Sequence, residues 1–159
     1  MRALLALLFI LSSAPAFAQI PDTFLRQVYD HYVGDHAVGL KLTSLSQLQG
    51  VFTPELARTI VNARKAGKLK NDPLIDAPTF RITDMHITID DSETGSANAE
   101  ARFSNLGHET AMNITLVKLP DGWRIADVES ENGSLRARLG PPPVKVKSVK
   151  KPVSKKKPK

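Results

Sequence analysis

Five ionisable side chains could support acid–base chemistry or hold a polar ligand: Tyr29, Tyr32, Asp84, His86 and Asp127. An isomerase or lyase needs a carboxylate or imidazole base and a hydroxyl that stabilises an enolate. In such an enzyme Asp84 or Asp127 would be the base, His86 would shuttle the proton and a tyrosine would donate to the enolate. The structural alternative is that the tyrosines belong to the core and that the aspartates face solvent or bond to the backbone. We favour this alternative, so we assign no catalytic residue and treat the five as candidate ligand-binding residues.

The sequence contains no recognised metal or nucleophile motif. It has no cysteine, which excludes disulfides, thiolate metal ligands and a cysteine nucleophile. The histidines fit no spacing used by metal sites, so we expect structural or surface roles for His31, His36, His86 and His108. A nucleophile elbow and a phosphate-binding glycine loop are also absent. We therefore expect neither a metal nor another cofactor.

Three helices are predicted before residue 70. Apolar residues at 24, 25, 28, 29 and 32 follow helical spacing, which predicts a helix capped by Asp22 or Thr23 and ending at Gly34. A short second helix is predicted over residues 43–49. Thr53 followed by proline and glutamate is typical of a helix start, and the third helix should end at Gly67.

After residue 77 the apolar period changes to two, which predicts strands over residues 79–89, 96–104, 109–118 and 123–128. Short turns rich in Asp, Asn and Gly separate them and favour an antiparallel meander. The alternation slips near Asp84 and between Ile125 and Val128, which predicts β-bulges. Residues 134–139 should form a last helical turn capped by Ser134. The predicted fold class is α+β, with N-terminal helices packed on a curved four-stranded antiparallel sheet.

The N-terminus has the three parts of a secretory signal peptide. Arg2 provides a positive start, nine apolar residues follow, and Ala16-Phe17-Ala18 matches the small residues that a signal peptidase requires. The apolar run is far shorter than the roughly 20 residues of a transmembrane helix. We therefore expect cleavage between Ala18 and Gln19, no transmembrane anchor, and a periplasmic or secreted domain over residues 19–139.

Residues 140–159 form a tail of a different composition. The tail has five prolines, no acidic or aromatic residue, and eight lysines, namely Lys145, Lys147, Lys150, Lys151, Lys155, Lys156, Lys157 and Lys159. All 16 acidic residues of the chain lie between residues 19 and 143. The composition predicts a disordered segment that could bind anionic envelope polymers in a salt-dependent manner, although it could equally be a solubilising appendage. Without aromatic residues to stack on bases, specific nucleic-acid binding is not expected.

The order of motifs resembles the nuclear-transport-factor-like α+β cone, a fold shared with ketosteroid isomerases, and within it a family of small exported bacterial domains of unknown function. The residues that carry this resemblance are Phe24, Val28, Tyr29 and Tyr32, then Phe52-Thr53-Pro54-Glu55-Leu56, Asn71-Asp72-Pro73-Leu74, Gly122-Trp123-Arg124-Ile125-Ala126-Asp127-Val128 and Ser134-Leu135-Arg136 with Leu139. The resemblance implies helices over the concave face of the sheet, a pocket at its open end and an exported location. It implies no common activity.

Three functions fit these observations. The first is a non-catalytic exported domain that binds a small ligand or a protein partner while its tail associates with anionic envelope material. The second is a pocket enzyme of the isomerase, lyase or hydrolase type. The third is an immunity-type or other interaction module that acts through a surface. An enzyme requires ionisable groups that converge in an apolar pocket, whereas an interaction module requires an exposed binding surface.

Overall fold

The computed structural model describes residues 20–140, apart from the side chains of residues 91 and 92. The predicted signal peptide, its cleavage site between Ala18 and Gln19, and residues 141–159 of the predicted tail lie outside the described residues. None of the helices formed by residues 20–140 is long and apolar enough to cross a membrane.

Helices α1 (Pro21–Tyr29), α2 (Leu45–Val51) and α3 (Pro54–Lys65) occupy the first half of the described chain. The cap predicted for α1 is wrong: the helix begins at Pro21, whose fixed φ suits the first helical position, and Ile20 precedes it without a side-chain cap. It also ends at Tyr29, before Gly34. The start of α3 is confirmed, because the Thr53 hydroxyl accepts a hydrogen bond from the Leu56 amide at 3.4 Å.

The second half of the chain is one antiparallel sheet in the order β1-β2-β3-β4-β5. Its strands are β1 (Ile82–Glu93), β2 (Ser96–Asn105), β3 (His108–Leu119), β4 (Gly122–Ser130) and β5 (Gly133–Ser134), and α4 (Leu135–Leu139) follows. The α+β class is therefore confirmed, but the sheet has five strands rather than four. The additional strand arises because the chain turns back after Ser130 and pairs two residues with the end of β4.

Both predicted β-bulges are present. The pairing of β1 with β2 jumps between Thr83 and His86, and Asp84 between them has a positive φ of 54°. The pairing of β3 with β4 shifts where Ala126 is inserted between Ile125 and Asp127. Bulges bend a strand and increase its twist, so these two positions account for part of the curvature of the sheet.

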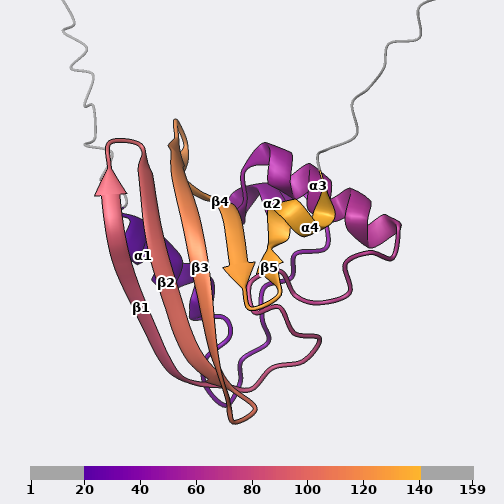
Figure 1. Cartoon of the computed structure of the whole chain (residues 1–159), viewed down its shortest axis with the longest axis vertical. Helices are drawn as coiled ribbons and strands as arrows, with labels where there is room; N and C mark the ends of the chain where they lie inside the picture. Colours follow the sequence, from indigo (N-terminus) through magenta and orange to yellow (C-terminus); the bar gives the residue numbers. More distant parts are fainter. Residues whose placement is uncertain (1–19, 141–159) are drawn as a thin grey trace, which may run out of the picture.

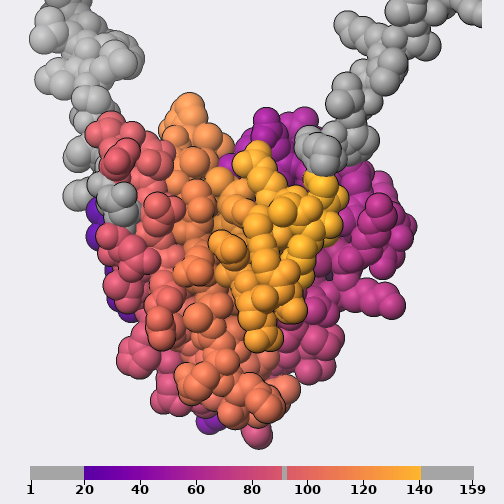
Figure 2. Space-filling model, in the orientation of Figure 1, coloured from indigo at the N-terminus to yellow at the C-terminus, as the bar shows by residue number. Residues whose placement is uncertain are grey.

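The helices cover one face of the sheet, and the other face is open to solvent (Figure 1). On the covered face of β2, Ala97, Ala99, Ala101 and Phe103 are each no more than 3% exposed. Asn98 and Arg102 alternate with them and are exposed. The last described elements, β5 and α4, lie between β4 and α3, as the space-filling view shows (Figure 2). The covered face is thus a packed core built from aliphatic and aromatic side chains.

Candidate functional site

The two tyrosines predicted as ligand-binding residues lie together in the core. Tyr29 and Tyr32 are at most 1% exposed, and their ring centroids are 6.2 Å apart. The Tyr29 hydroxyl donates to the Leu74 carbonyl at 3.0 Å, and the Tyr32 hydroxyl donates to Asp72 Oδ2 at 2.8 Å. Burial raises the pKa of both phenols, and the charge of Asp72 raises it further. Both hydroxyls therefore stay protonated and hold α1 and the chain after it against residues 72–74.

Asp72 is the partner that links this core pair to the loop before the sheet. Its Oδ1 atom accepts a hydrogen bond from the Leu74 amide at 2.8 Å, which closes a local turn. Burial raises the pKa of Asp72, and the hydrogen bonds from Leu74 and Tyr32 offset this only in part. The Asn-Asp-Pro segment thus shapes the crossover from helices to sheet.

Replacing Tyr32 with phenylalanine should lower the free energy of unfolding by about 2 kcal/mol, because the partly buried Asp72 carboxylate loses a donor. Because the pKa of Asp72 is raised by burial, the loss should shrink as the pH falls and the carboxylate takes up a proton. Tyr29→Phe is the control, because the Leu74 carbonyl that its hydroxyl contacts does not titrate. Urea denaturation at neutral and mildly acidic pH measures both variants. A loss for Tyr32→Phe that does not depend on pH would contradict this role of Asp72.

The other three predicted residues do not join the buried pair of tyrosines. Asp84 and His86 are exposed on β1, and Asp84 occupies the bulge. Asp127 holds the start of α4: its Oδ1 accepts from the Arg136 amide at 2.9 Å, and its Oδ2 accepts from the Ser134 hydroxyl. The structure brings Tyr29 and Tyr32 together and does not bring the other three to them.

At least three hollows lie on the described part of the molecule. One of about 480 Å³ is bordered by Tyr32 and Phe80, and a predicted site residue, Tyr32, contributes to it. A second, of about 410 Å³, lies beside Val38 and Leu42. The third, also of about 410 Å³, is lined mainly by polar side chains. Within residues 20–140, no group of three or more His, Asp or Glu side chains is placed to hold a metal ion.

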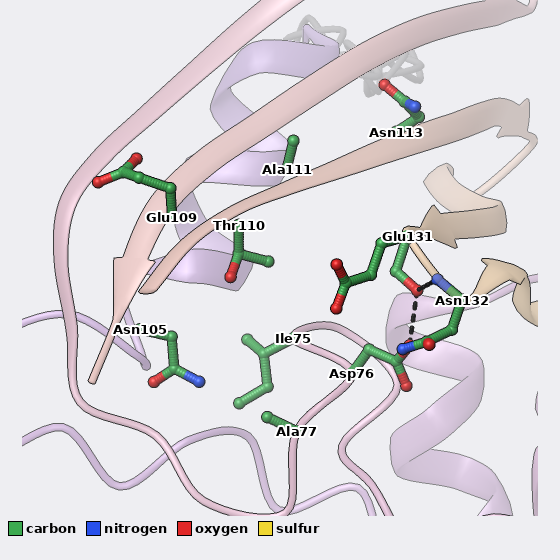
Figure 3. Close-up of a pocket in the computed structure, with 11 residues that line it drawn as sticks. Ile75, Asp76, Ala77, Asn105, Glu109, Thr110, Ala111, Asn113, Glu131 and Asn132 are labelled. Carbon is green, nitrogen blue, oxygen red and sulfur yellow. Dashed lines mark hydrogen bonds between the residues drawn. The ribbon is translucent and has the colours of Figure 1, made fainter. Parts of the chain in front are cut away.

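We call the third hollow the β3 hollow. Its lining comes from three separate segments, namely residues 75–77, residues 105, 109–111 and 113, and residues 130–132. Figure 3 shows Glu131 extending from the turn after β4 toward Thr110 on β3, with Ile75 and Ala77 on the opposite side. The lining includes three acidic residues and no basic one, so the site attracts positive charge. Figure 3 shows the Glu131 carboxylate directed into the hollow, whereas the Glu109 carboxylate points away from it at the rim.

Asp76 builds the wall of the β3 hollow. Its side chain is 6% exposed, and Oδ2 accepts from the Ser130 hydroxyl at 2.6 Å and from Asn132 Nδ2 at 3.1 Å. Arg138 of α4 forms an ion pair with the same carboxylate at 3.1 Å. Burial opposes ionisation, but these donors outweigh it and lower the pKa of Asp76. The carboxylate therefore ties the loop before the sheet to the turn after β4.

The sequence reasoning missed the residues of the β3 hollow. Asp76, Glu109 and Glu131 stand in no motif, and they are brought together by pairing between distant segments. One signal was present: the strand predicted over residues 109–118 is longer than its neighbour predicted over 123–128. A length mismatch between adjacent antiparallel strands leaves part of the longer one without a partner.

Comparison of the chain with protein-family models, with curated proteins and with solved structures finds no match in any of the three. The fold and the site by themselves define an α+β domain with an open antiparallel sheet and an acidic surface hollow.

Proposed function

We propose that the protein is an exported, non-catalytic binding domain that holds a small ligand or a segment of a protein partner in the β3 hollow. The observation that carries the proposal is the hollow itself: about 410 Å³ of space with polar and apolar lining beside a sheet edge. This volume lies within the roughly 300–1,000 Å³ typical of ligand sites. The buried tyrosines, by contrast, already use their hydroxyls in internal hydrogen bonds, which supports a structural role rather than a catalytic one.

We further propose that the domain belongs with the nuclear-transport-factor-like cones. The order of helices before a bent antiparallel meander supports this relation, as do the bulges at Asp84 and Ala126. In this domain aliphatic and aromatic side chains fill the covered face of the sheet, so the proposed binding site lies at its edge instead of within a cone.

Photocrosslinking in the bacterial periplasm tests the binding site. A photoreactive side chain at Asn113, which is exposed and lines the hollow, should form an adduct with a discrete partner. The matched control is Asn62, which is exposed on α3. Native mass spectrometry of the purified protein covers the case of a small ligand. Equal adducts from both positions, together with no co-purified ligand, would argue against the hollow as a binding site.

The export and envelope proposals have their own test. The lysine-rich tail supports a salt-dependent association with anionic polymers. We expect the mature chain to begin at Gln19 and to be recovered from the periplasm or medium. It should also bind cell-wall material less tightly as salt rises, and a variant with the eight tail lysines changed to glutamine should lose this binding. If that variant binds cell-wall material as tightly as the wild type does, the tail does not mediate an association with the envelope.

A further inference from the structure

The free half of β3 is an unpaired strand edge. Residues 108–112 pair with residues 101–105 of β2 on one side, whereas the pairing with β4 begins only at Asn113 and Glu129. Beyond this pair β4 turns away to join β5. In an edge strand, alternate residues direct their backbone N–H and C=O groups to the open side, where a further strand can pair with them.

This edge opens into the β3 hollow, where negative charge gathers. Glu109 and Glu131 are exposed, and within residues 20–140 neither forms an ion pair. Asp76 is already paired with Arg138, so the carboxylates available to a strand at this edge are those of Glu131 in the hollow and Glu109 at its rim. A row of unpaired backbone N–H and C=O groups favours binding of an extended peptide, which can pair with them as a strand. Carboxylates beside that row favour peptides that carry lysine or arginine side chains.

We propose that the β3 hollow binds an extended, lysine- or arginine-bearing segment of a protein partner, which adds as a strand to the free edge of β3. This inference rests on the proposed function and specifies the class of partner. We commit to a separate chain as the partner, and occupation of the hollow by the protein's own lysine-bearing tail is an outcome that the titration below distinguishes.

Isothermal titration of the full mature chain with a short peptide of alternating valine and lysine tests the proposal. Two matched peptides separate backbone pairing from charge: one has alternate amides N-methylated, and the other has glutamate in place of lysine. Both should bind at least about tenfold more weakly, because the first cannot complete the strand ladder and the second meets like charge. Glu109→Gln/Glu131→Gln should weaken the valine–lysine peptide about fivefold. The control Asp30→Asn/Glu93→Gln changes two exposed acids elsewhere and should leave its affinity unchanged.

Each of four results would overturn the inference: no binding of the valine–lysine peptide, equal binding of the N-methylated peptide, equal weakening in the control variant, or a large gain in affinity when the eight tail lysines become glutamine. The last result would identify the tail as the occupant. If Asn113 still crosslinks a partner while the peptide does not bind, only the class of partner is wrong. If both experiments fail, the hollow is not a binding site.

Discussion

Replacing Asp76 with alanine should lower the free energy of unfolding by about 3 kcal/mol and the melting temperature by about 10 °C. Four side-chain donors lose their shared acceptor, whose side chain is 6% exposed; they come from Asn71, Ser130, Asn132 and Arg138. Asp76 also has a φ of 49°, a conformation that alanine adopts less readily than aspartate or asparagine. Thermal and urea denaturation, followed by circular dichroism, measure the loss.

Asp76→Asn separates the charge from the backbone conformation. It tolerates the positive φ and keeps one acceptor oxygen, so it should cost about half as much as the alanine variant. Because folding lowers the pKa of Asp76, its contribution is fully present above the ordinary value of 3.8 and is lost as the pH falls below it. The stability difference between wild type and Asp76→Asn should therefore shrink in acid. If the stability difference between wild type and Asp76→Asn stays constant as the pH falls below 3.8, the ionised carboxylate does not have this role.

Replacing Ala101 with leucine should lower the free energy of unfolding by about 2 to 3 kcal/mol. Ala101 is 0% exposed on the covered face of β2, where it lies between Ile87 and Met112 in the sheet. A larger side chain has to displace its packed neighbours. If an empty ligand cup lay between helices and sheet instead, the leucine would extend into it at little cost.

Asn98→Leu is the matched control, because Asn98 lies on the same strand but on the exposed face. Its effect should stay within about 0.5 kcal/mol. Both variants are compared by urea denaturation at neutral pH. Equal stability of the two variants would contradict a filled core and would return the ligand site to the covered face of the sheet.

Most of the fold could be predicted because it depends on local patterns. The period of two in residues 96–104 identified β2, and slips in that period located the bulges at Asp84 and Ala126. The Thr53-Pro54 pair marked the start of α3. The cap of α1 was misplaced because Asp22 and Thr23 are good cap residues, but the proline before them had already begun the helix.

The candidate site could not be predicted in the same way. Asp76, Thr110 and Glu131 are separated by tens of residues and meet only through the register of β3 and the turn after β4. The candidate residues were chosen from the sequence because their side chains can do acid–base chemistry. The kind of side chain does not show which groups it will bond to in the folded protein. Asp127, for example, uses its carboxylate to hold the start of α4. A buried hydrogen-bond network becomes visible only when the distant segments are placed together.

Amide hydrogen exchange along β3 tests most directly whether its first half is a binding edge. In the free protein, alternate amides of residues 108–112 should exchange quickly, whereas those of residues 113–117, which lie between two strands, should be protected. Adding the valine–lysine peptide should slow the fast amides by at least about tenfold. Fast amides that the peptide leaves unchanged, or protection that appears instead around Tyr32 and Phe80, would contradict the account.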